Sequence, residues 1–194
     1  MLLAVMLLVR AAGARLVYRV NPGLLRERAG LPIHGDQPWA DRLLLLAVLA
    51  TGFLGLPAIA GLDVFRWHML HRPPPLLSGI GLILFALGWS IKNLALRANA
   101  FATTVVRLQS ERAHVVADSG VYAVVRHPFY AADPLILAGL GLWLESYLAV
   151  LCAVIPVALM VIRLRLEERF LRRELPGYND YMVRVPHRLI PGVW

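Results

Sequence analysis

The stretch LLLLAVLATGFLGLPAIAGL, residues 43–62, is a run of 20 residues without a charged side chain. A helix of this length covers the ~30 Å hydrocarbon core of a bilayer. Gly52, Gly55 and Pro57 interrupt the run, but membrane helices tolerate glycine and proline where neighbouring helices pack closely. The run therefore predicts a transmembrane helix, and this prediction decides the fold class.

The composition of the whole chain agrees with this prediction. Of its 194 residues 59% are hydrophobic, and the mean hydropathy is +0.64, well above the values of soluble domains. The net charge of +8 does not indicate a nucleic-acid partner, because the basic residues lie at the ends of apolar runs. Cys152 is the only cysteine, which argues against disulfides and against a zinc cluster.

Three further apolar segments lie on either side of this run. Residues 1–9 predict a short, tilted first helix, and residues 76–91 predict another span. The apolar interval 131–162 is too long for one helix and contains Asp133 and Glu145, so we expect a tight helical hairpin that turns near Glu145. The predicted fold is all-α: a polytopic integral membrane protein with about five transmembrane helices, the last two forming the hairpin, followed by a cytosolic C-terminal region.

The positions of the basic residues predict the orientation. Segments 10–42, 92–126 and 163–188 carry 18 of the 20 basic residues, and the loop 63–75 carries the other two. Cytosolic loops are enriched in Lys and Arg, so these three segments should face the cytosol. We expect one domain over residues 1–194, with N-terminal helices in 1–97 and the functional half in 98–194.

The decamer VYAVVRHPFY, residues 121–130, is the best candidate for a functional site. Arg126 and His127 supply a cation and a titratable ring, and Pro128 favours the start of a new helix. Polar residues are costly to place in lipid, so those that a membrane protein keeps near its apolar segments often mark functional sites. Asp133, one turn further on, could face the same pocket.

Two carboxylates follow on the last predicted helix. Arg163 and Glu167 share a helix face at i and i+4, and Glu168 and Arg172 form a second such pair. An exposed salt-bridge ladder is the alternative interpretation. The tail beyond them holds Tyr178, Tyr181 and Trp194, and an interfacial anchor explains Trp194 better than the two tyrosines, which lie among charges. His68 and His71 lack further ligands nearby, so we predict no metal site.

These residues resemble a known family. The motif Ser119-Gly120-Val121-Tyr122, the Arg-His-Pro-Phe-Tyr of residues 126–130, the hairpin, and Arg163 with Glu167-Glu168 resemble the isoprenylcysteine carboxyl methyltransferase family. The resemblance covers about residues 107–194, and the Asn-Pro at 21–22 resembles bacterial members. It implies an integral protein of the bacterial inner membrane whose active site faces the cytosol and whose cofactor is S-adenosyl-L-methionine.

The resemblance also implies roles for individual residues. Arg163 would contact the substrate and Glu167 would act beside it as the second catalytic residue. The implied cofactor contacts are His114, Val115, Val116, Ala117, Tyr122, Arg126, His127, Pro128, Tyr130, Glu167, Glu168, Tyr178 and Tyr181. An extra residue at Leu175-Pro176 leaves open whether Glu167 or Glu168 is the matching acid. The implied partners are the lipid bilayer and a lipid acceptor, with no nucleic acid.

The motifs do not identify the acceptor of the methyl group. Methyl transfer from a sulfonium needs aligned reactants and exclusion of water rather than a nucleophilic side chain. Arg163 could orient an isoprenoid carboxylate by a bidentate pair, whereas a phospholipid amine would need a base such as His127 or a glutamate. Membrane NADPH-dependent sterol reductases carry a similar Arg-His-Pro-x-Tyr, and a non-enzymatic scaffold is the third alternative.

Overall fold

A computed structural model describes residues 2–20, 22–24, 39–103 and 114–194. Every regular element in these ranges is a helix, which confirms the all-α prediction. Three continuous helical stretches are long and apolar enough to cross a membrane, Trp39–Trp67, Pro75–Ala98 and Tyr147–Glu174. Helices α1 (Leu2–Tyr18) and α7 (Asp133–Trp143) are shorter, with 17 and 11 residues. The prediction of about five spans is therefore confirmed for three.

The first of these stretches is longer than the apolar run that predicted it. It consists of α3 (Trp39–Leu49), η1 (Ala50–Gly55), α4 (Leu56–Leu62) and η2 (Asp63–Trp67). The π-helical turn η1 immediately precedes Pro57, which has no backbone N–H to continue the ordinary α-helical ladder. The loop expected from residue 63 begins only at His68, which has a left-handed φ of 51°.

The second stretch, α5 (Pro75–Ala98), also exceeds its predicted end at Ile91. Lys92 does not close the helix. Its side chain lies inside the molecule, where its ammonium nitrogen is 2.5 Å from Asp133 Oδ1. A buried partner lets the charge stay within the span, which composition alone could not reveal.

The predicted hairpin is present and turns where expected. Helices α6 (Pro128–Ala131) and α7 enter it, and α8 (Tyr147–Cys152) and α9 (Val154–Glu174) leave it. Glu145 adopts a φ of 60° at the turn. Ser146 Oγ accepts from the Ala149 backbone N–H at 3.0 Å and donates to Asp63 Oδ2 at 2.7 Å. The turn is thereby tied to the end of the first span.

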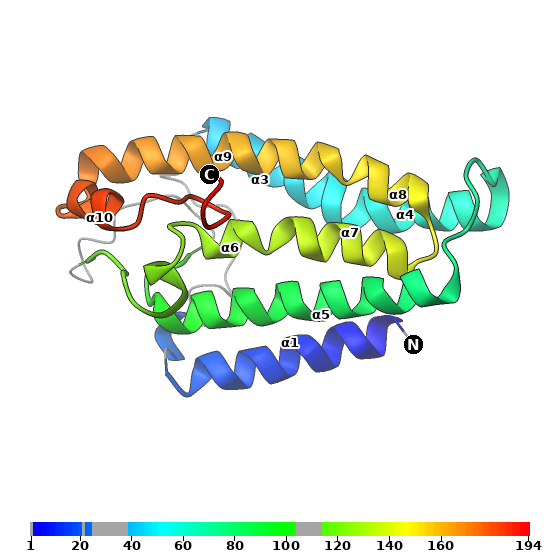
Figure 1. Cartoon of the computed structure of the whole chain (residues 1–194), viewed down its shortest axis with the longest axis horizontal. Helices are drawn as coiled ribbons and strands as arrows, with labels where there is room; N and C mark the ends of the chain where they lie inside the picture. The colour runs from blue at the N-terminus through cyan, green and yellow to red at the C-terminus, as the bar shows by residue number, and fades with distance from the viewer. Residues whose placement is uncertain (1, 21, 25–38, 104–113) are drawn as a thin grey trace.

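Helices α5 and α7 form the centre of the bundle (Figure 1). Phe85, Ile136 and Leu140 are buried between them. Gly81 and Gly139 let the two backbones approach closely, since a Cβ added at Gly139 would lie 2.7 Å from the Gly81 carbonyl oxygen. Helix α1 packs on α5, and α3 packs on α9.

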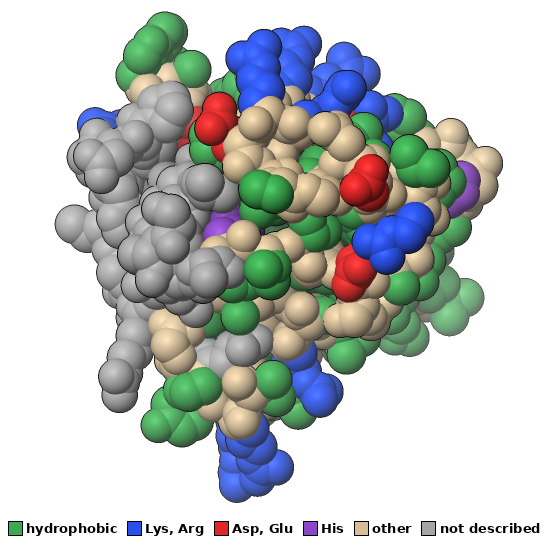
Figure 2. Space-filling view, turned by 90° about the vertical axis from the view of Figure 1, so that its left-hand side faces the viewer, with side chains coloured by type: hydrophobic (Ala, Val, Ile, Leu, Met, Phe, Trp, Pro, Cys, Tyr) green, Lys and Arg blue, Asp and Glu red, His purple; other side chains and the backbone are tan. Residues whose placement is uncertain are grey.

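The charged C-terminal segment is folded against the bundle. Helix α9 continues to Glu174, and Gly177, with a φ of 80°, turns the chain into α10 (Tyr178–Arg184). The end of the molecule that carries α10 displays Lys and Arg side chains around its edge (Figure 2). This arrangement places the candidate residues of α6, α9 and α10 at one end of the bundle.

Candidate active site

A cavity of about 680 Å³ opens between the helices at this end. We call it the central cavity. Its polar part is lined by His114, Val115, Val116, Ala117, Tyr122, Arg126, His127, Tyr130, Glu167 and Tyr178, and its apolar part includes Val48, Leu49, Phe53, Ile136 and Leu137. The volume lies in the range of small-molecule sites. One space therefore joins the polar residues of the decamer to the apolar residues between the membrane helices.

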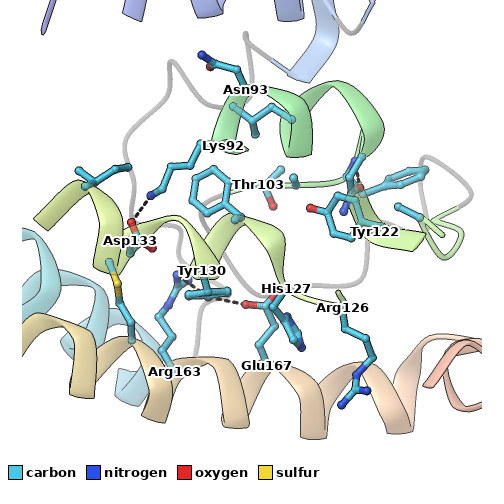
Figure 3. Close-up of a pocket in the computed structure, with 18 of the residues that line it drawn as sticks. Lys92, Asn93, Thr103, Tyr122, Arg126, His127, Tyr130, Asp133, Arg163 and Glu167 are labelled. Carbon is cyan, nitrogen blue, oxygen red and sulfur yellow. Dashed lines mark hydrogen bonds and ion pairs between the residues drawn. The ribbon is translucent and has the colours of Figure 1, made fainter. Parts of the chain in front are cut away.

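Glu167 is part of a hydrogen-bonded chain that crosses the cavity wall (Figure 3). Tyr130 Oη donates to Glu167 Oε2 at 2.6 Å, and Arg163 Nη1 donates to Tyr130 Oη at 3.1 Å. Arg163 in turn donates to both carboxylate oxygens of Asp41, at 2.7 and 3.4 Å. This chain fixes the orientation of Glu167 and Arg163 from three different helices.

Glu168 lies beside Glu167 in sequence but has different surroundings. Arg126 donates to Glu168 Oε1 from Nε at 2.9 Å and from Nη2 at 2.7 Å. Arg188 Nε donates to Glu168 Oε2 at 2.7 Å. Glu168 is only 5% exposed, so an exposed salt-bridge ladder with Arg172 is wrong for this residue. Its carboxylate instead joins the decamer to the C-terminal segment.

Backbone hydrogen bonds strengthen the same junction. The Arg126 N–H donates to the His187 carbonyl and the His127 N–H donates to the Arg188 carbonyl, both at 2.9 Å. Arg126 Nη1 also donates to the Val185 carbonyl at 2.8 Å. The C-terminal segment is thus a structural wall of the site.

The tyrosines of α10 complete this wall. Tyr178 is 4% and Tyr181 is 1% exposed, and burial raises the pKa of both above the usual tyrosine value. Tyr181 Oη donates to the Tyr122 carbonyl at 2.7 Å. Tyr178 Oη and His127 Nε2 lie 3.5 Å apart. Both tyrosines stay protonated near neutral pH, so Tyr181 keeps its hydrogen bond to Tyr122 and Tyr178 presents an O–H donor to the cavity.

Trp194 does not line the central cavity. Its ring contacts the guanidinium carbons of Arg165 and Arg188, at 5.7 and 5.4 Å from the ring centre. These contacts are cation–π interactions. The role of Trp194 as an interfacial anchor stays a prediction.

The structure brings together most of the residues expected from the sequence. All expected cofactor contacts except Pro128 and Glu168 line the central cavity, and so does Arg163. Pro128 is buried at the start of α6, where it sets the direction of that helix. His114 stacks on Phe101 with ring centres 4.4 Å apart. Asp133 faces the same cavity, as expected.

The sequence patterns did not identify two residues that belong to the site. Asp41 is buried at 6% exposure and pairs with Arg163, 122 positions away in sequence. Lys92 lines the cavity and pairs with Asp133. The available signal was an ionisable residue in or beside each apolar span, which marks a functional position in a membrane protein. Its partner could not be read from sequence spacing.

The histidines of the predicted loop lie away from this site. His68 and His71 are exposed and belong to the loop between the first two spans. Within the described ranges, the structure has no group of three or more His, Cys, Asp or Glu side chains placed to hold a metal ion.

Comparisons with known proteins agree with the resemblance drawn from the motifs. The model of the phospholipid methyltransferase family matches residues 77–176, a segment that contains most of α5, the decamer, the hairpin and Glu167-Glu168. No curated protein matches the chain. Because the family model covers more than half of the sequence, the chain belongs to the phospholipid methyltransferase family, a family of membrane methyltransferases.

Proposed function

We propose that this protein transfers a methyl group from S-adenosyl-L-methionine to a lipid acceptor at the cytosolic face of the membrane. The observation that carries the proposal is the continuity of the central cavity. Its polar part is lined by His127, Tyr178 and Glu167, and its apolar part reaches Phe53 and Leu137 among the membrane helices. A soluble cofactor and a lipid need these two environments side by side.

The residues of the polar part fit the cofactor. Glu167 has a carboxylate on the cavity, which suits an ammonium group or ribose hydroxyls. Val115, Val116 and Ala117 present backbone and small apolar side chains, and Tyr178 offers a hydroxyl. When bound, S-adenosyl-L-methionine supplies a methyl group on a sulfonium sulfur. Glu168 and Pro128 would support this site without touching the cofactor.

The remaining residues would exclude water and orient the acceptor. Arg163 lies between Glu167 and Asp133 on the cavity wall (Figure 3). Its guanidinium already uses two edges, one toward Asp41 and one toward Tyr130. A bidentate pair with an acceptor carboxylate would have to displace Asp41, which is buried. This arrangement favours a phospholipid amine over an isoprenoid carboxylate as the acceptor.

An amine acceptor adds a requirement for a proton acceptor. Each methyl group added to an amine breaks one carbon–sulfur bond, forms one carbon–nitrogen bond and releases one proton. His127 and Glu167 line the cavity and are the candidates to receive it. Tyr130 donates to Glu167 and Arg163 donates to Tyr130, so this chain would hold the accepting carboxylate in place, and it offers no further acceptor for the proton.

The test is a methyl-transfer assay with the purified protein. The protein in mixed micelles would receive labelled S-adenosyl-L-methionine with either phosphatidylethanolamine or an isoprenylated cysteine carboxylate, and extracted lipids would be counted. We expect label in the phospholipid. Label only in the isoprenoid would reverse the choice of acceptor, and label in neither would contradict the proposed activity.

A further inference from the structure

Lys92 and Asp133 form a second polar centre in the central cavity, away from the residues proposed for the cofactor (Figure 3). Lys92 is 8% and Asp133 is 4% exposed. Lys92 is the single lysine of the chain and lies on the membrane-spanning helix α5, whereas Asp133 begins α7. A charge in such a place is expensive, so it calls for a functional explanation.

A purely structural role explains the pair poorly. Helices α5 and α7 already pack through Phe85, Ile136 and Leu140 and through the close backbone approach at Gly81 and Gly139. A buried ion pair commonly stabilises no more than apolar residues of similar volume would. The contact between the helices does not need these two charges.

The pair also has hydrogen-bonding capacity left over. The ammonium nitrogen of Lys92 is 2.5 Å from Asp133 Oδ1, and it lies 4.1 Å from the centre of the Phe129 ring. Among the residues that the structure describes, the side chains of Lys92 and Asp133 make no other hydrogen bond or ion pair. An ammonium has three N–H donors and a carboxylate has two oxygens, so donors and one acceptor remain, side by side, on the cavity wall.

We propose that Lys92 and Asp133 recognise the headgroup of the acceptor lipid, Lys92 binding its phosphate and Asp133 binding its amino group. This inference rests on the proposed methyl transfer and names the residues that select its substrate. A headgroup with a cation and an anion a few bonds apart matches the one unused oxygen and the unused N–H groups of the pair. A lipid with a single negative charge would leave Asp133 without a new partner.

The pair also lies at the boundary between the apolar and the polar part of the cavity, where the headgroup of a bound lipid would be located. Ile136 and Leu137, in the apolar part of the cavity, lie about one helical turn after Asp133 on α7, and Tyr130 lies about one turn before it. An acyl chain among the apolar residues therefore has its polar end at the pair, with its amino group at Asp133, about one helical turn from Tyr130. This order along α6 and α7 gives the headgroup a definite direction relative to the cofactor residues.

The first test separates headgroup recognition from helix packing. One variant carries Lys92→Met with Asp133→Leu, a second carries the exchange Lys92→Asp with Asp133→Lys, and the control carries Arg72→Met with Glu145→Met, which removes an exposed pair at the opposite end of the bundle. For each, the affinity for S-adenosylhomocysteine and the KM for phosphatidylethanolamine are measured in mixed micelles.

We expect the neutral variant to keep its S-adenosylhomocysteine affinity and to raise KM for the lipid about tenfold or more. The exchanged pair should not restore KM, because it reverses the charges offered to the headgroup, and the control should behave as the parent protein. An unchanged KM, or full recovery in the exchanged variant, would overturn the inference and leave the proposed activity standing. If the parent protein binds no S-adenosylhomocysteine and methylates no lipid, both fail together.

A second measurement needs no variant. The thermal midpoint of the parent protein is recorded with glycerophosphoethanolamine, with glycerol 3-phosphate and with ethanolamine, each at the same concentration. We expect glycerophosphoethanolamine to raise the midpoint more than either half does, since it alone satisfies both members of the pair. Equal stabilisation by glycerol 3-phosphate, or stabilisation by none, would overturn the inference.

Discussion

Two adjacent glutamates on one helix have separate roles because the helix turns them to different neighbours. Glu167 faces the central cavity and accepts from Tyr130, whereas Glu168 is buried between Arg126 and Arg188. The first is available to a ligand. Glu168 holds the decamer against the C-terminal segment. Replacing Glu167 should therefore impair ligand binding, whereas replacing Glu168 should lower stability.

Replacing Glu167 should weaken cofactor binding without unfolding the protein. In Glu167→Gln the amide keeps a contact with Tyr130 but removes the charge, so the Kd for S-adenosylhomocysteine should rise by about tenfold to a hundredfold. Calorimetry on the detergent-purified protein measures it. Glu174→Gln, an exposed change on the same helix, is the matched control, and an unaltered Kd in Glu167→Gln would remove the residue from the site.

Replacing Glu168 should instead lower stability. Glu168→Ala leaves Arg126 buried without its carboxylate, and breaking a buried pair in this way costs about 3–5 kcal/mol. Thermal unfolding followed by circular dichroism should show a clearly lower midpoint than in Glu167→Gln. If Glu168→Ala unfolds at the temperature of the parent protein, the ion cluster does not hold the two segments together.

The sequence predicted this site only in part. The decamer and the i, i+4 spacing of Arg163 and Glu167 indicated which residues matter, because polar groups stand out between apolar runs. Asp41 and Lys92 could not be assigned, because their partners are distant in sequence and each looked like an ordinary charge at the end of a span. Glu168 looked as exposed as Glu167, since periodicity does not tell which face meets the C-terminal segment.

At the scale of elements, the helices are positioned by close contacts between α5 and α7. The hairpin was predictable because one apolar interval contained a polar break at Glu145. The residues at which the spans end could not be predicted. Two π-helical turns lengthen the first span, one before Pro57 and one at its end, and the ion pair of Lys92 allows α5 to continue beyond the residue that should have ended it.

A side chain added between α5 and α7 should therefore destabilise the bundle. In Gly139→Ala the new Cβ would lie 2.6 Å from the Phe85 backbone nitrogen, and overpacking of this kind costs about 1–3 kcal/mol or more. Gly79→Ala is the control, because nothing lies within 4 Å of its added Cβ. Thermal unfolding should rank Gly139→Ala well below the control, and equal midpoints would refute close packing at this position.

At the scale of the whole molecule, the charge distribution predicts the orientation in the membrane, and the shape of the cavity supports the proposed function. Among the described residues, the basic segments at the end of α1, the start of α3, the end of α5 and in α10 lie toward the same end of the bundle (Figure 1). The overall class could be predicted because hydropathy and charge are properties of the chain as a whole. The cavity could not, since its lining residues come from ten separate helical elements and from the loop residues on either side of the segment 104–113.

The orientation can be tested by cysteine labelling. In a Cys152→Ser background, His71→Cys and Arg173→Cys place single exposed thiols at the two ends of the molecule. In right-side-out membranes an impermeant maleimide should label the first and should label the second only after permeabilisation. Labelling in the reverse order would place the cavity's polar end outside the cytosol.

The central claim is that the cavity binds S-adenosyl-L-methionine, and a parallel titration tests it most directly. The detergent-purified protein is titrated by calorimetry with S-adenosylhomocysteine and, separately, with NADPH. The account predicts saturable binding of S-adenosylhomocysteine, which Glu167→Gln weakens, and no binding of NADPH. Binding of NADPH alone would indicate a reductase, and binding of neither would contradict the assignment of the cavity to a methyl donor.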